Sequence, residues 1–582
     1  MSEISAARTW GQDWAAHVGG LGLAAIAFAI LPKPFFSHFF DRNAAPQFLA
    51  LLIVAGLLSI TALFKNSLTF RSPVLGVMIA ALAVSTSISL FFSHNIVGGI
   101  IGDAGRYNGV ASLIALVLIA FYFSHLTVGE ISVALDWIAV ICVGVTLIGL
   151  AQWWKWISLP GDSGIGSTLG NIDFLSAWIG TTIVIVVLHP RRFHLMHVAK
   201  TIYCILAFYL LWRIGAKQGI IDIALIAIAC VIWRFRRLLR FNQLTPRFWT
   251  VSLCALFLLW CEFIYLVPMA QIPVPGINHD PNIRIRTDFW FSGMNMLFHH
   301  LFFGVGPDNY GYYYEKYRSL SSVKMTETVV SNDAHSAMVQ TLGTMGVIGT
   351  LAFTALIFYF IYSLVFSFYR HENERPLYLA FGLFAAIYLT NSLESPMTLP
   401  NKAIFWALCG WVIGRNIWRN SEAQMKKFSW TKTMVGVLAA SLLITASSFG
   451  WALFNFASAQ DGATSGKKPS YSYSTLLPCT LYFAPQFNYA VASGSNSEEL
   501  GKRVLSTNSR CVDAQATLVT ILFQQRKYQE AKPYIYSLLD TAPGRRGVVR
   551  LAAIYALQTH DVTLEKALVK QGFNLGILVT SG

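Results

Sequence analysis

Apolar residues recur along this chain in runs of roughly 20, the length that crosses the hydrocarbon core of a bilayer. These runs lie near residues 15–32, 47–64, 73–93, 109–126, 131–154, 174–189, 200–213, 219–233, 249–270, 346–368, 377–394, 403–418 and 433–456. Lipid offers no hydrogen-bond partner to backbone amides, so a helical bundle is the arrangement that accommodates so many long apolar runs. The pattern therefore predicts an all-α polytopic transmembrane bundle of about 12–13 spans.

Composition supports the membrane assignment. The chain has 582 residues, 55% of them hydrophobic and only 12% charged, with a mean hydropathy of +0.53. A soluble protein of this size has no core large enough for so much apolar surface. The N-terminal sequence lacks a basic region, and the run from Ala15 to Pro32 is followed at once by further runs, which argues against a cleavable signal peptide.

Basic residues are divided unevenly between the predicted loops. If the N-terminus is cytoplasmic, the cytoplasmic loops carry Lys65, Arg71, Arg191, Arg192, Lys200, Arg234, Arg236, Arg237, Arg240, Arg247, Arg370, Arg375, Arg419, Lys426, Lys427 and Lys432. The positive-inside rule selects this orientation, and we interpret the net charge of +15 as a topology signal, with no nucleic-acid partner expected. The long loop from Gln271 to Met345 and everything after Phe456 then lie outside.

The C-terminal part differs in character from the apolar runs. We expect a membrane domain over 1–430, a last transmembrane helix over 431–456, and a linker and helical tail over 457–582. Within the tail, 511–571 resembles two tetratricopeptide units spaced about 34 residues apart, and a plain helical cap is the alternative. Cys479 and Cys511 are predicted to form a disulfide in an oxidising compartment, with two free thiols as the alternative.

Polar residues that are costly near a membrane concentrate in the loops predicted to open on the outer face. They are Arg106, Asn171, Asp173, Arg213, Lys217, Arg284, Arg286, His299, His300, His335 and Glu394. Several arginines with few carboxylates suit a diphosphate, because the guanidinium fork binds phosphate oxygens in pairs. No metal site is predicted, since no His, Asp or Glu cluster has ligand spacing. No nucleotide cofactor is expected either, because Gly304-Val305-Gly306 is too short a glycine motif.

Several of these segments resemble the O-antigen ligase and O-antigen polymerase family. Arg286 to Trp290 is similar to R-x-x-x-W, and His299 to Tyr310 is similar to H-P-L-x-G-x-G-x-x-N-F. Asp333-Ala334-His335-Ser336 and Gln340 to Gly349 resemble the stretch A-H-N-x-x-L-Q-x-L-x-E-x-G-I-I-G. Gly170 to Phe174 resembles G-N-P-N, and Gly105 to Gly109 resembles G-R-Y-x-G. The resemblance covers roughly residues 90–420.

The resemblance implies a metal-independent glycosyltransferase of the GT-C type in a bacterial inner membrane. Its donor is a glycan on undecaprenyl diphosphate, and its acceptor is lipid A core, another glycan or a protein. The essential arginine and histidine carry over to Arg286 and His335. The family's third essential residue, an arginine in S-R-G, has Lys217 in its place here, with Arg213 one turn earlier. The chain also departs at Ser336, where the family has asparagine, and it lacks the proline of H-P-L.

We assign roles on this basis. Arg286 holds the diphosphate and stabilises its developing charge, together with Arg213, Lys217, Arg284 and Arg106. His335 accepts the acceptor's proton. Glu394 orients His335, pairs with an arginine or is itself the base. Asn171, Asp173, His300 and Asn309 position the substrate.

Each role has a structural alternative. In these alternatives, Arg286 forms a surface ion pair with Asp288, and His335 starts a helix that Asp333 caps. Asn171 and Asp173 are helix caps as well, and Arg106 has a structural role. The aromatic run Tyr310 to Tyr317 is an interfacial belt or a platform for sugars. Two further functions remain open: a transporter, which predicts broken helices and inverted repeats, and a scaffold that presents the tail.

Overall fold

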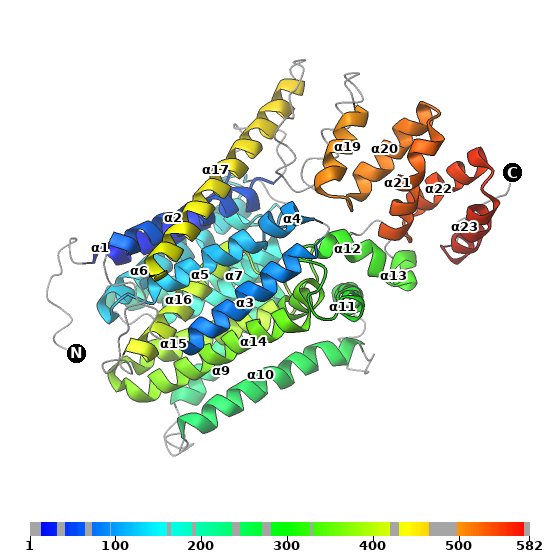
Figure 1. Cartoon of the computed structure of the whole chain (residues 1–582). Helices are drawn as coiled ribbons and strands as arrows, with labels where there is room; N and C mark the ends of the chain where they lie inside the picture. Colours follow the sequence, from blue (N-terminus) through cyan, green and yellow to red (C-terminus); the bar gives the residue numbers. More distant parts are fainter. Residues whose placement is uncertain are drawn as a thin grey trace.

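The computed structural model describes residues 13–31, 41–64, 73–93, 95–159, 164–188, 194–234, 245–269, 281–325, 330–418, 430–464 and 497–575, and these form helices without a strand. A large bundle is followed by a smaller helical tail beside one end of it (Figure 1). The bundle helices are α1 (Trp14–Phe28), α2 (Ala44–Phe64), α3 (Pro73–Phe91), α5 (Val110–Phe123), α6 (Val128–Trp153), α7 (Ile172–Val187), α8 (His194–Arg213), α9 (Lys217–Arg234), α10 (Pro246–Met269), α14 (Ala337–Arg370), α15 (Arg375–Ser392), α16 (Leu399–Trp418) and α17 (Trp430–Thr464). Each apolar run of the sequence coincides with one of them, so the predicted fold class is confirmed.

Helices of the bundle meet closely where their residues are small. Six of the described helices are long and apolar enough to cross a membrane, and α1, α5 and α7 are shorter apolar helices. Between α5 and α16, a Cβ added at Gly410 would collide with the backbone of Ala120, and one at Gly414 with that of Ser124. Small residues let helix backbones approach in lipid, where dispersion contacts drive association.

The long loop between α10 and α14 is itself largely helical. It contains α11 (Pro281–His299), α12 (Tyr310–Tyr317) and α13 (Leu320–Met325), and a short α4 (Ile96–Ile101) follows α3 at the same end of the bundle (Figure 1). The sequence alone did not indicate these helices. Their residues are mixed in polarity, so they produce none of the apolar runs that marked the spans.

Helix α14 is broken at Gly346, where φ is 67° and ψ is −170°. The segment after α11 docks at this break through its backbone: Val305 N donates to Gly343 O at 3.1 Å, and Val347 N donates to Leu301 O at 2.9 Å. A side chain at Gly304 would collide with the backbone of Thr344. The Gly-Val-Gly motif therefore joins two backbones, which explains its glycines without a nucleotide.

The tail consists of α19 (Ser497–Thr507), α20 (Val512–Gln524), α21 (Tyr528–Thr541), α22 (Arg546–Thr559) and α23 (Val562–Leu575). Neighbouring helices in this order pack on one another. Cys511 is disulfide-bonded, and Cys479 lies outside the described residues. The tetratricopeptide resemblance stays a prediction.

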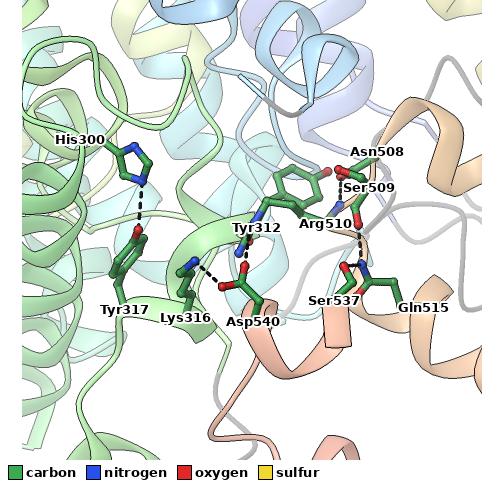
Figure 2. Close-up of polar contacts among 10 residues, drawn as sticks. All are labelled: His300, Tyr312, Lys316, Tyr317, Asn508, Ser509, Arg510, Gln515, Ser537 and Asp540. Atoms are coloured by element: carbon green, nitrogen blue, oxygen red, sulfur yellow. Dashed lines mark hydrogen bonds and ion pairs between the residues drawn. The ribbon is translucent and has the colours of Figure 1, made fainter. Parts of the chain in front are cut away.

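The tail contacts the bundle through α12 (Figure 2). Lys316 Nζ lies 2.6 Å from Asp540 Oδ1, and Arg510 Nη1 lies 3.3 Å from Asp540 Oδ2. The Arg510 guanidinium also lies over the Tyr313 ring, 4.1 Å from its centroid. At the end of the same helix, the Tyr317 hydroxyl and His300 Nε2 are hydrogen-bonded at 2.9 Å. Ionic and aromatic contacts therefore fix the tail to α12.

Reversing one charge at this contact should loosen α12. In Asp540→Lys the new ammonium repels Lys316 and Arg510, and we expect a loss of about 1 kcal/mol of local stability, since exposed pairs contribute little more. Hydrogen exchange in 310–317, measured by mass spectrometry, should accelerate, and Lys316→Asp in the same chain should recover part of the protection. Reversal of Glu499 and Arg503, an ion pair at 3.3 Å elsewhere in the tail, serves as control. Unchanged exchange in Asp540→Lys would contradict this account.

Candidate functional site

The first component of the site is an ion pair between two helices. Arg286 lies on α11, and its Nη1 is 3.7 Å from Oε2 of Glu394, which follows α15. Both side chains remain partly accessible, with exposed fractions of 22% and 38%. The predicted alternative, a surface pair of Arg286 with Asp288, is not what the structure shows. An arginine held by a single carboxylate, with guanidinium surface still open, can bind a phosphate oxygen.

His335 lies in a tight turn immediately before α14. Its φ is 52°, a left-handed conformation that is uncommon for histidine. The His335 amide donates to Asp333 Oδ1 at 2.6 Å, and the Ala334 amide donates to Gln340 Oε1 at 2.8 Å. The imidazole stacks on Phe289 of α11, with ring centroids 5.2 Å apart. Both backbone and ring of His335 are therefore held in place.

Ser336 caps α14 at the position where the resembled family has asparagine. Its hydroxyl accepts from the Val339 amide at 3.2 Å, and it is hydrogen-bonded to the Tyr265 hydroxyl at 2.6 Å. Tyr265 in turn packs edge-on against Trp290, the tryptophan of the R-x-x-x-W motif. A serine thus performs the capping that the turn needs. The cap is Ser336 itself and not Asp333, which instead accepts from the His335 amide.

Burial lowers the pKa of His335 to about 4, and the positive charges of Arg106 and Arg286 act in the same direction while Asp333 opposes them. At neutral pH the imidazole is therefore uncharged and able to accept a proton. It is a weaker base than an unperturbed histidine, whose pKa is near ~6.5. For Glu394, burial raises the pKa and Arg286 lowers it.

The fall of kcat/KM at low pH, the acid limb, should depend on the surroundings of His335. If His335 must be neutral to accept a proton, kcat/KM is full well above pH 4 and falls as pH decreases through about 4. Arg106→Gln removes a repelling cation, so the pKa of His335 should rise and the limb should move to higher pH. The measurement is transfer rate against pH in purified protein, normalised for each variant. An acid limb at the same pH in Arg106→Gln as in the wild type would contradict the assignment of His335 as the proton acceptor.

Arg106 reaches the site from a sharp turn between α4 and α5. Gly102 and Gly105 in this turn have φ of 98° and 77°. Asp308 holds the turn, because its Oδ2 accepts from the amides of Asp103 and Asn108, each at 2.9 Å. The Arg106 guanidinium lies 5.2 Å from the centroid of the Phe174 ring. The G-R-Y segment is thus tied to the loop that follows α11.

A cavity of about 190 Å³ lies beside the His335 turn. Its polar lining includes Asn108, Asp308, Asp333, Gln340 and Lys402, and the rest is mostly apolar side chains from α3, α5, α14, α15 and α16. A second, almost wholly apolar pocket adjoins it along α3, α5, α14 and α16, and the two share Phe353, Ile357, Phe405 and Trp406. A partly polar cavity thus lies next to an apolar one.

The other predicted residues have varied surroundings. The Arg213 guanidinium lies over the Trp153 ring at 4.8 Å and is exposed, as are Lys217, Arg284 and Asp173. Asn171 caps α7. None of these has a contact in the described part of the chain that joins it to Arg286 or His335.

Two predicted substrate-positioning residues hold loops. His300 is bonded to Tyr317, as described above. Asn309 is fully buried and donates to the Ser93 hydroxyl at 2.6 Å, while its Oδ1 accepts from Asn95 at 3.1 Å. These contacts connect the segment after α3 to the segment after α11, so both residues have a structural role in this state.

Sequence reasoning missed Asp308, Gln340, Tyr265 and Lys402. Asp308 and Gln340 stand inside the quoted motifs, so the motif itself was a signal for them. Tyr265 and Lys402 reach the site only through the packing of α10 and α16. Among the described residues, no group of three or more His, Cys, Asp or Glu side chains is arranged to hold a metal.

Fold and site together define a polytopic membrane protein with a cationic, histidine-containing site at one end of a helical bundle. Residues 174–354 match the family model described as O-antigen ligase. This match supports the O-antigen ligase and polymerase superfamily, with a glycosyltransferase-like function in the membrane. No curated protein matches the chain. The matched region contains Arg286 and His335, whereas Arg106, Glu394 and Lys402 lie outside it.

Proposed function

We propose that the protein transfers a glycan from undecaprenyl diphosphate to an acceptor hydroxyl on the periplasmic face of the inner membrane, as an O-antigen ligase. The observation that carries this proposal is the pairing of Arg286 with Glu394 beside the neutral, half-buried His335. These three side chains supply an anion-binding fork and a proton acceptor at one end of the bundle.

The reaction is a displacement at the anomeric carbon of the donor glycan. The acceptor oxygen forms a bond to that carbon, the bond to the diphosphate oxygen breaks, and the bonding pair leaves with the diphosphate. Arg286 stabilises the charge that develops on the leaving group, with Arg106 near enough to influence His335. His335 takes the acceptor proton. Because its basicity is low, stabilisation of the leaving group must supply more of the rate.

The cavity next to the site suits a lipid carrier. Its apolar lining continues along α3, α5, α14 and α16, which is the environment that a polyprenyl chain requires. A volume of about 190 Å³ accommodates part of such a chain, and the rest would lie in the bilayer. The uneven distribution of basic residues supports an orientation with the site and the tail outside, by the positive-inside rule.

A transporter is a weaker second reading. It predicts broken helices near mid-membrane, and α14 is broken at Gly346. However, the apolar run of this helix starts at the break, so the interruption lies at the end of the span. The break also serves to dock the segment after α11.

Deletion of the gene in its host tests the proposal. Lipopolysaccharide is examined on gels, together with the pool of glycan bound to undecaprenyl diphosphate. Bare lipid A core with long polymer accumulating on the carrier supports a ligase. Core bearing a single repeat unit would indicate a polymerase instead. An unchanged ladder would reject both, and modified periplasmic proteins would then point to a protein O-oligosaccharyltransferase.

A further inference from the structure

Three buried carboxylates lie directly behind the turn that carries His335. The exposed fractions of Asp103, Asp308 and Asp333 are 0%, 3% and 4%. Two of them bind backbone amides that shape the site: Asp308 accepts from Asp103 and Asn108, and Asp333 accepts from His335. Buried carboxylates in such a group repel one another and lose hydration, so a cation nearby stabilises their charged form.

Lys402 supplies that cation from a different helix. It lies in the first turn of α16, and its Nζ donates to Asn108 Oδ1. The backbone amide of Asn108 in turn donates to Asp308, so Asn108 links Lys402 to this carboxylate. Burial lowers the pKa of Lys402, Asp333 and Asp308 oppose this by attracting the ammonium, and Arg106 repels it; Lys402 lines the same cavity as the two carboxylates.

Asp308 is linked to the histidine turn through Gln340. Gln340 Nε2 donates to Asp308 Oδ1 at 3.4 Å, and Gln340 Oε1 accepts from the Ala334 amide. The turn therefore rests on Asp333 directly and on Asp308 through Gln340. His335 adopts a left-handed backbone conformation, which persists only where its surroundings hold it.

We propose that Lys402 is a positioning residue for glycan transfer: by balancing the buried carboxylates of Asp308 and Asp333, it holds the turn that presents His335. This inference rests on the function proposed above. It does not place Lys402 on the diphosphate, because the carboxylates that face the ammonium disfavour a further anion there.

The test compares full-length variants purified in detergent. Lys402→Met removes the charge, Lys402→Arg keeps it, and Lys402→Met with Asp308→Asn removes one charge of each sign. Lys527→Met, an exposed tail lysine paired with Glu498, is the control. We measure kcat and donor KM for glycan transfer, and the rate at which diethyl pyrocarbonate modifies His335, followed by mass spectrometry.

We expect Lys402→Met to lower kcat by about 10- to 100-fold, the effect of a misplaced catalytic group. Donor KM should stay within about twofold, since uniform binding is unaffected. His335 should be modified several times faster, while Lys402→Arg and the double variant return toward wild type. An unchanged kcat with unchanged modification would overturn the proposal. A raised donor KM with normal kcat would also overturn it, by showing that Lys402 binds the donor.

The rate at which diethyl pyrocarbonate modifies His335 tests the positioning role of Lys402 separately from the proposed function. If the wild-type chain transfers no glycan, the proposed function fails, yet His335 reactivity still decides whether Lys402 holds the turn. If the wild type transfers glycan and all Lys402 variants match it in both measurements, only the positioning role fails.

Discussion

Arg286→Ala is expected to reduce glycan transfer by about 10²- to 10³-fold in kcat, the usual effect of removing one preorganised donor from a developing anion. The guanidinium is held beside Glu394 and keeps an exposed fraction of 22%, so it needs little rearrangement to meet a phosphate oxygen. Arg286→Lys keeps the charge but loses the planar fork, and its activity should lie between those of the wild type and Arg286→Ala. Transfer is measured with purified protein and carrier-linked glycan.

Arg503→Ala is the matched control for this prediction. Arg503 is also an arginine in an ion pair with a glutamate, Glu499, but it lies on α19 of the tail. The control should express and transfer like the wild type. An Arg286→Ala protein that retains more than about a third of wild-type kcat would refute the role given to this arginine, because the expected loss is far larger.

His335→Ala is expected to lower kcat by about 10²- to 10⁴-fold, the range for loss of a general base. The ring is stacked on Phe289 and the backbone is tied to Asp333, so alanine removes the proton acceptor while the turn keeps its hydrogen bonds. Donor affinity should change little, which binding of labelled carrier-linked glycan would measure. His197→Ala, an exposed histidine on α8, is the control.

A different result for His335→Ala would assign the role of general base to another residue. If the variant keeps most of its kcat and Glu394→Gln does not, Glu394 is the base. In that case the pairing of Arg286 with Glu394 would have to open during the reaction.

The sequence predicted the membrane helices well because each one carries a long, mainly apolar run, a property that does not depend on tertiary contacts. It did not predict α11 to α13, where polar and aromatic residues alternate without such a run. The family resemblance singled out Arg286 and His335, and their roles stay predictions. The left-handed φ of His335 and its stacking on Phe289 could not be predicted from the sequence, since both arise when α11 packs against the start of α14.

Lys402 shows more clearly which features the sequence alone could not predict. In the sequence it is a single lysine at the start of an apolar run, and nothing nearby marks it. Its hydrogen-bond partner Asn108 lies 294 positions earlier in the chain. Only the packing of α16 against α5 brings them together. Motif reasoning also assigned His300 and Asn309 to substrate, whereas in the fold they hold loops.

The low pKa of His335 has a consequence for the environment in which the protein can work. In the orientation proposed above, the site lies on the outer face of the inner membrane and experiences the pH of the surrounding medium far more directly than a cytoplasmic enzyme does. An unperturbed histidine would be mostly protonated at pH 5.5 and unable to act as a base. With a pKa of about 4, His335 remains mostly neutral there. Glycan transfer by the proposed mechanism should therefore continue in mildly acidic surroundings that would silence an enzyme relying on an ordinary imidazole.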